Sequence, residues 1–115
     1  MSREVTGRKA LRALVVGAGP AAVALHLPVL AGLRDKREVE LALICDLQHE
    51  RAAAACSRFG FAEQTGDGIA AIERSDIDAV YIFGSARLHF EYGLVALRAG
   101  KHLFVEKPIA PSYAA

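Results

Sequence analysis

The stretch LRALVVGAGPAA, residues 11–22, indicates the fold, because an apolar strand here leads through a glycine-rich turn into a helix. Its first half is rich in Leu and Val, as a parallel strand buried on both faces requires. GAGPAA then fits the pattern G-x-G-x-x-G/A, in which Gly17 permits the tight turn and Gly19 lets the backbone approach a pyrophosphate. Ala22 allows close packing of the helix against the strand. The pattern predicts a dinucleotide-binding turn.

Pro20 and Ala21 complete the turn and begin a helix that we expect over residues 20–33. A proline is favourable at the first helical position, because its missing N–H would have no partner there. Pro28 lies deeper in the same segment, so we expect a kink at that residue. The free N–H groups at the start of such a helix are suited to the phosphates of a nucleotide.

The second strand, residues 39–46, ends in an acid, Asp46. An acid at this place accepts hydrogen bonds from ribose hydroxyls, and its charge repels the extra phosphate of NADP. We therefore predict NAD rather than NADP, although Arg51 in the next helix could swing toward that phosphate. Two other nucleotide classes stay open here: a flavin, whose folds often show GxGPAG but prefer Glu at this acid, and S-adenosylmethionine, the methyl donor of methyltransferases.

Strands and helices alternate along the rest of the chain. We expect helices over residues 48–60, 67–75 and 86–100, and strands over residues 61–65, 77–83 and 101–106. Asp67 is a predicted N-cap, and Gly60 and Gly100 are predicted to end their helices. Such alternation implies parallel strands joined by right-handed crossovers. The predicted fold is α/β of the Rossmann type, a doubly wound parallel sheet of about five strands in the order 3-2-1-4-5.

Composition excludes several functional classes. The 115 residues correspond to one domain, and 14 Lys and Arg against 13 Asp and Glu create no field that attracts nucleic acid or an anionic membrane. Cys45 and Cys56 have neither disulfide nor metal-ligand spacing, so we expect reduced thiols in a cytoplasmic protein, and no metal site. The apolar run over residues 11–33 is interrupted by glycines and prolines, which argues against a membrane span or a signal peptide.

The stretch AGKHLFVEKPIA, residues 99–110, runs from an apolar strand into the charged pair Glu106 and Lys107. Pro108 disfavours helical geometry in the residue before it, so Lys107 is expected in extended backbone where the strand ends. In a doubly wound sheet, ligands bind at the carboxyl ends of the strands. The pattern therefore predicts a cation at the mouth of a binding site.

Together with GAGPAAVALHLPVL (17–30), ICD (44–46), DIDAVYI (76–82) and His89, this stretch resembles the Gfo/Idh/MocA family. The family comprises glucose–fructose oxidoreductases, inositol dehydrogenases and their relatives. The resemblance extends over residues 11–110, nearly the whole chain, and rests above all on the EKP stretch. A glycine motif alone would indicate only a superfamily.

The resemblance implies an NAD(P)-dependent oxidoreductase. Such an enzyme transfers hydride between nicotinamide and a hydroxyl, carbonyl or imine carbon of a small, sugar- or polyol-like substrate. Lys107 matches the family's lysine that assists proton transfer beside the nicotinamide, and Glu106 is expected with it in the cofactor site. His89 matches a further position near the reacting atoms. Gly84 and Ser85 belong to the loop that packs near the nicotinamide.

That loop departs from the family. Many members have Thr-Pro-Asn followed two residues later by His, whereas this chain has Gly84, Ser85 and Ala86 before Arg87, Leu88 and His89. The departure leaves the substrate class open. The altered loop is also consistent with a second interpretation, in which the chain is a non-catalytic NAD-binding regulatory or scaffold protein.

In this family the nucleotide domain is followed by a larger α/β domain that closes the substrate site and often forms the oligomer interface. We therefore expect residues 1–115 to be the NAD(P)-binding domain of a longer, homo-oligomeric enzyme. This domain would be inactive alone, because the substrate domain and a sixth strand are missing. The strand over residues 101–106 would then be an open sheet edge, whose unpaired N–H and C=O groups favour self-association.

Overall fold

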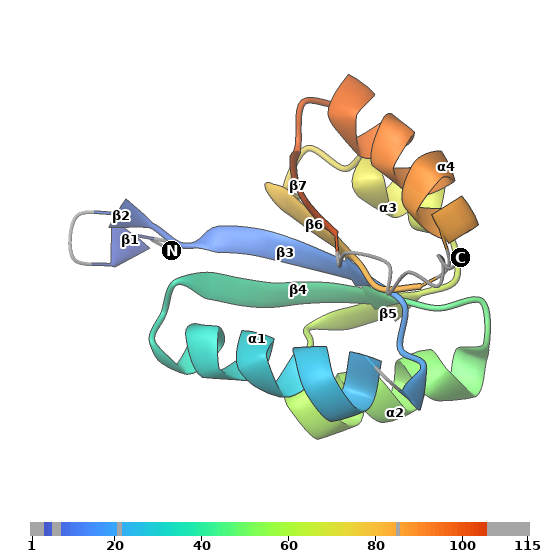
Figure 1. Cartoon of the computed structure of the whole chain (residues 1–115). Coiled ribbons are helices and arrows are strands. Elements are labelled where there is room, and N and C mark those ends of the chain that lie inside the picture. Colours follow the sequence, from blue (N-terminus) through green and yellow to red (C-terminus); the bar gives the residue numbers. More distant parts are fainter. Residues whose placement is uncertain (1–3, 6–7, 21, 85, 106–115) are drawn as a thin grey trace, which may run out of the picture.

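A parallel sheet forms the centre of the molecule (Figure 1). Its strands are Leu11–Val16 (β3), Val39–Cys45 (β4), Glu63–Thr65 (β5), Ala79–Ile82 (β6) and His102–Val105 (β7). This computed structural model describes residues 4–5, 8–20, 22–84 and 86–105. The order across the five-stranded sheet is β5-β4-β3-β6-β7. Numbered along the chain this is the predicted order 3-2-1-4-5, so the doubly wound Rossmann fold is confirmed.

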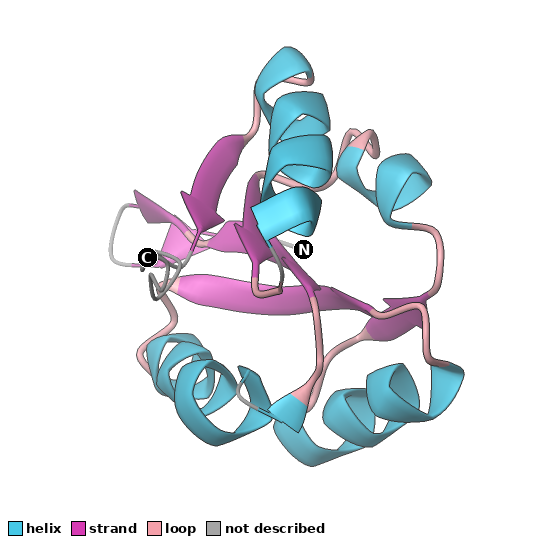
Figure 2. Ribbon diagram, turned by 45° about the vertical axis from the view of Figure 1, so that its right-hand side comes forward, coloured by secondary structure: helices cyan, strands magenta, loops and turns pink. Residues whose placement is uncertain are grey.

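Helices cover both faces of the sheet (Figures 1 and 2). The π-helix Ala22–His26 (η1) and the helices Leu27–Asp35 (α1) and His49–Phe59 (α2) lie on one face, and Gly68–Ile72 (α3) and Ala86–Arg98 (α4) lie on the other. The winding reverses between β3 and β6, so the carboxyl ends of these two strands form the topological switch point. No helix in the described part of the chain combines the length and the apolar character that crossing a membrane requires.

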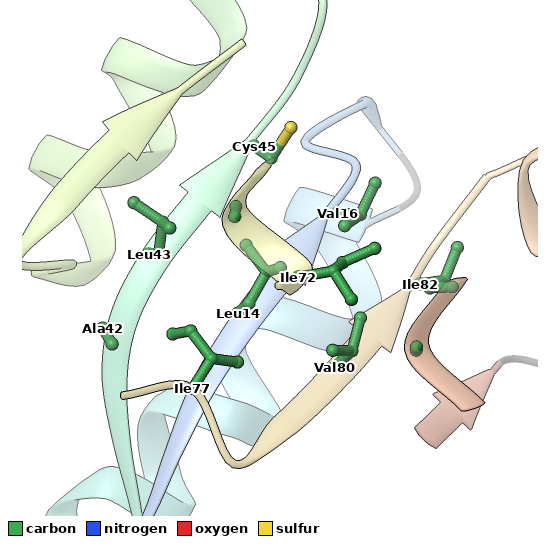
Figure 3. Close-up of a cluster of buried hydrophobic side chains, with 11 residues drawn as sticks. Leu14, Val16, Ala42, Leu43, Cys45, Ile72, Ile77, Val80 and Ile82 are labelled. Carbon is green, nitrogen blue, oxygen red and sulfur yellow. The ribbon is translucent and has the colours of Figure 1, made fainter. Parts of the chain in front are cut away.

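Two hydrophobic layers hold the helices to the sheet, because successive residues of a strand point to opposite faces. Leu14 of β3 and Val80 of β6 pack with Ile72 of α3 on one face (Figure 3). Val15 of the same strand packs on the other face with Leu27 of α1. This double burial explains why the central strands are continuous apolar runs rather than alternating ones.

The predicted helix ends are confirmed where a cap was expected. The Asp67 Oδ1 atom accepts the Ala70 N–H at 3.1 Å, which caps α3. Gly60 ends α2 with a left-handed φ of 78°, and Gly100 follows α4 with a φ of 73°. Residues with a Cβ rarely adopt this conformation, so the glycines set where these helices stop.

The structure differs from the predictions in several places. Helix α3 ends at Ile72, three residues before the predicted end at residue 75. The helix predicted over residues 20–33 is divided into η1 and α1, and the division precedes Leu27 rather than falling at Pro28. Pro28 instead occupies the first turn of α1, directly after the π-helical turn of η1. In addition, Glu4–Val5 (β1) and Arg8–Lys9 (β2) pair as an antiparallel hairpin that the sequence did not indicate.

Candidate functional site

The glycine turn after β3 packs directly against the backbone that follows β6. Gly17 has a φ of 108°, and a Cβ atom built there would lie 1.9 Å from the Phe83 carbonyl oxygen. The Gly17 N–H donates to the Cys45 carbonyl at 2.8 Å, and the Phe83 N–H donates to the Val16 carbonyl at 2.8 Å. The turn is thus fixed to both neighbouring strands, and only glycine fits at its first position.

Asp46 follows β4 and links the glycine turn to the start of α2. Its Oδ2 atom accepts the Ala18 N–H at 2.9 Å, and its Oδ1 atom accepts the Gln48 N–H at 2.8 Å. Each carboxylate oxygen has a second acceptor position, so the group can still receive hydrogen bonds from a ligand. The acid predicted to bind a ribose therefore also orders the turn.

A pocket of about 260 Å³ lies at the carboxyl ends of β3, β4 and β6. Its walls come from the glycine turn, from the residues around Asp46, from the first turn of α2 and from α4. The lining residues are Val16, Gly17, Gly19, Cys45, Asp46, Leu47, Gln48, Arg51, Phe83, Gly84, Leu88 and Tyr92. This is the crevice at the switch point, where doubly wound sheets bind their ligands.

The structure brings together Gly17, Gly19, Asp46 and Gly84 of the predicted cofactor residues, since all four line this pocket. Pro20 and Ala22 do not line it. Pro20 is exposed, and Ala22 is buried at the start of η1. The expected part of Ala22 in close packing of helix and strand stays a prediction.

The remaining predicted residues lie elsewhere. Ala21, Ser85, Glu106 and Lys107 lie outside the described residues. His89 is half-buried in α4, and its Nε2 atom is buried without a hydrogen-bond partner among the residues that the structure describes. It does not line the pocket.

Sequence reasoning missed the wall that α4 supplies. Leu88 and Tyr92 stand one helical turn apart and both line the pocket. A Cβ atom at Gly84 would lie 2.8 Å from the Leu88 Cδ1 atom, so this glycine lets α4 approach the end of β6. The apolar spacing of four residues at the start of α4 was the available signal. The same spacing is equally typical of a helix whose apolar side packs against the core, so it does not by itself indicate a pocket.

Phe83 was missed as well: it is the last residue of the predicted strand, it follows β6 in the structure, and it belongs to no motif. Its ring stacks on the His26 imidazole, with centroids 4.6 Å apart and an interplanar angle of 16°. His26 belongs to η1, so this stack ties the helix after the glycine turn to the residue whose carbonyl faces Gly17. The two sides of the turn are therefore held in one position.

The thiol in the pocket, Cys45, is held in its protonated form. Burial, together with the negative charges of Asp46 and Asp67, raises the pKa of Cys45 to about 11. Burial also raises the pKa of Tyr92. Both groups stay protonated at neutral pH, and a protonated thiol is neither a nucleophile nor a metal ligand. The pocket therefore offers glycine backbone, a carboxylate and a guanidinium, which suit binding of a polar ligand.

Comparisons with known proteins agree with this geometry. Residues 11–115 match a family described as an oxidoreductase family with an NAD-binding Rossmann fold. A 3-reductase of Streptomyces violaceoruber, which acts on dTDP-3,4-didehydro-2,6-dideoxy-α-D-glucose, is 39% identical over 101 residues, 88% of this chain and 28% of the relative.

Two solved structures show the same arrangement of strands and helices. A 3-ketoreductase from Actinomadura kijaniata in complex with NADP and TDP-benzene superposes with a TM-score of 0.77 at 37% identity, over 88% of this chain and 30% of that one. A levoglucosan dehydrogenase in complex with NADH gives a TM-score of 0.76 at 32% identity, over 89% and 29% of the two chains. The chain thus spans less than a third of the length of these relatives.

Proposed function

The chain belongs to the Gfo/Idh/MocA oxidoreductase family as its NAD(P)-binding Rossmann domain, and on that premise we propose that the pocket at the glycine turn binds a nicotinamide dinucleotide. The proposal depends mainly on one observation, the hydrogen bond between the glycine turn and the Asp46 carboxylate. The turn has no space for a side chain at Gly17, and the carboxylate beside it is already oriented by two backbone N–H groups.

Each part of the pocket has a role in this proposal. Gly19 leaves the backbone open to the diphosphate, because no side chain covers it. The free acceptor positions of Asp46 receive the hydroxyls of the adenosine ribose. Leu88 and Tyr92 give the pocket an apolar wall on the side of α4.

We propose NAD as the preferred dinucleotide. Asp46 carries a negative charge at the place where NADP has its additional phosphate, and the next residue, Leu47, supplies no compensating cation. The relatives themselves use either form, since one solved structure contains NADP and another contains NADH. The acid is therefore the feature of this chain on which the preference depends.

The parent enzyme, of which residues 1–115 would be the nucleotide-binding domain, is proposed to oxidise or reduce a sugar- or polyol-like substrate. When bound, the nicotinamide would accept or supply the hydride. Lys107 would polarise the reacting oxygen and assist proton transfer, with Glu106 and His89 nearby and with Gly84 and Ser85 in the adjoining loop. The substrates named for the relatives, a dTDP-linked sugar and levoglucosan, support this class.

We further propose that the parent is a cytoplasmic homo-oligomer and that this chain alone self-associates through β7. This strand lies at the edge of the sheet, and Phe104 and Val105 are 43% and 48% exposed. An open edge with apolar side chains favours pairing with another chain. Sedimentation over a concentration series should show association that weakens in Phe104→Lys. A chain that stays monomeric throughout would contradict it.

Titration of the chain with NADH, NADPH and S-adenosylmethionine tests the proposed function. We expect saturable NADH binding, weaker NADPH binding and none of S-adenosylmethionine. Gly19→Ala should lower NADH affinity roughly tenfold or more, because its methyl group covers the backbone that the diphosphate approaches. Its Cβ atom would lie 3.5 Å from a flexible Arg51 side chain, so the fold should tolerate it.

Gly32→Ala is the matched control, because a Cβ atom there meets nothing within 4 Å. Its NADH affinity should equal that of the wild type. Tighter binding of NADPH than of NADH would reverse the cofactor preference. Absence of NADH binding, or an equal affinity of Gly19→Ala and wild type, would contradict the site.

A further inference from the structure

Arg51 places a positive charge beside the glycine turn. A Cβ atom built at Gly19 would lie 3.5 Å from the Arg51 Nη1 atom, and both residues line the pocket. Gly19 is the position whose open backbone would face the diphosphate. The guanidinium therefore lies where a phosphate oxygen would approach this backbone.

The charge of Arg51 is not used within the described part of the chain. Arg12, Arg74 and Arg87 each bond a carboxylate, and Arg34 bonds both a carboxylate and a carbonyl oxygen. The Arg51 guanidinium makes no hydrogen bond or ion pair with any residue that the structure describes, Asp46 included. A guanidinium has donors in a planar fork that match two phosphate oxygens at once.

The place of Arg51 in its helix is unfavourable for a cation. It lies in the first turn of α2, which begins at His49 after the N-cap Gln48. The N-terminal end of a helix carries a partial positive charge and favours anions. A bound anion would compensate both the partial positive charge of the helix and the charge of the guanidinium. Anion binding therefore explains an arginine at a helix position where it does not stabilise the helix.

We propose that Arg51 is a ligand of the dinucleotide diphosphate in this chain. The inference rests on the proposed function, because it requires that the pocket binds a dinucleotide. It assigns Arg51 to the group that NAD and NADP share, rather than to the additional phosphate of NADP. The guanidinium adjoins Gly19, which would face the diphosphate, whereas the Asp46 carboxylate is the group proposed to receive the ribose hydroxyls.

Truncated ligands distinguish these assignments. Affinities of Arg51→Met and Arg51→Lys are measured for NADH and NADPH directly, and for ADP and adenosine by competition with NADH. Arg51→Met should weaken NADH, NADPH and ADP by a similar factor, roughly tenfold, and leave adenosine unchanged. Arg51→Lys should recover part of the loss. The salt dependence of NADH affinity should also decrease in Arg51→Met, because one charged contact is removed.

Arg58→Met is the matched control on the same helix. Its guanidinium lies over the Phe59 ring, 5.0 Å from the centroid, and does not line the pocket. All affinities of this variant should equal those of the wild type. A loss in Arg51→Met that is confined to NADPH would overturn the assignment, and so would unchanged affinities for every ligand. If the wild type does not bind NADH at all, the proposed function fails and this inference fails with it.

Discussion

At the amino ends of the strands, charged side chains form ion pairs with one another. At the carboxyl ends, the charged side chains of the pocket form no ion pair with any described residue. Arg12 of β3 donates to Glu40 of β4 at 2.8 Å and to Asp76, before β6, at 3.5 Å. Arg74 donates to the same Asp76 at 2.8 Å and to Glu63 of β5 at 3.0 Å. One network therefore connects three neighbouring strands and the segment before β6 at this end.

The carboxyl ends carry two charges in the pocket, and these are not paired with each other. Asp46 accepts the N–H groups of Ala18 and Gln48, and the Arg51 guanidinium makes no hydrogen bond or ion pair with described residues. The amino ends thus use their charges to hold the strands together, while the carboxyl ends keep acceptors and donors for a ligand. We infer that variants of the charged side chains at the two ends should separate stability from binding.

The largest expected effect is on folding, from a variant at the carboxyl end. Gly17→Ala combines a left-handed φ with a Cβ atom placed against the Phe83 carbonyl oxygen. We expect the free energy of unfolding to fall by on the order of 2–4 kcal/mol. Denaturant titration measures it, with Gly32→Ala as the control. Wild-type stability of Gly17→Ala would show that the turn can move away from β6.

The next effect separates the two ends. Arg12→Met removes the guanidinium that joins β3, β4 and the segment before β6, so the free energy of unfolding should fall by about 1–2 kcal/mol. NADH affinity should stay within about twofold of the wild type, because Arg12 lies at the other end of the sheet. Arg87→Met, which breaks an exposed pair on α4, is the control with little effect on stability. A large loss of NADH affinity in Arg12→Met would contradict the claim that the amino-end charges affect stability alone.

The smallest effect is a pH dependence of the amino-end network. Hydrogen bonds from Arg74, and then its charge, hold the pKa of Glu63 below its usual range, and a hydrogen bond from Arg74 does the same for Asp76. A carboxyl group with a lowered folded pKa adds stability above its unfolded pKa, about 4, and this is lost as pH falls through the folded pKa.

The stability difference between wild type and Arg74→Met should therefore be constant from neutral pH down to about pH 5 and should shrink below about pH 4. Both carboxyl groups are largely exposed, so the change is expected to be small. Unfolding curves at several pH values measure it. A difference that grows as the pH falls would contradict the assigned sign.

The fold was predictable because its signals are local. The apolar runs of β3 and β4, the glycine turn and the caps at Asp67 and Gly60 each depend on neighbouring residues. The hairpin of β1 and β2 was not predicted, since strands of two residues provide no periodic pattern. A kink was predicted at Pro28, whereas the helix changes from η1 to α1 before Leu27, because a proline is unfavourable inside a helix but favourable in its first turn.

The site was predictable only in part. Gly17, Gly19 and Asp46 could be assigned to the pocket because motif spacing determines where they lie relative to the strand ends, and Gly84 because of the family resemblance. The link between Asp46 and the Ala18 N–H, and the position of Arg51 beside Gly19, depend on how two loops meet in space. The charge network at the amino ends of the strands also depends on contacts that form only in the folded chain, since Arg12 and Asp76 are 64 positions apart in the sequence. Residue types alone do not indicate such pairs.

NMR spectra of the ¹⁵N-labelled chain during NADH titration test the central claim, that the carboxyl ends bind the dinucleotide while the amino ends only stabilise the sheet. The account predicts that the amide signals of Gly17, Gly19 and Gly84 shift progressively and reach saturation. The amide signals of Arg12 and Lys101, at the opposite end, should stay in place. Shifts concentrated at Arg12 and Lys101, or no saturable shift at the glycine turn, would contradict it.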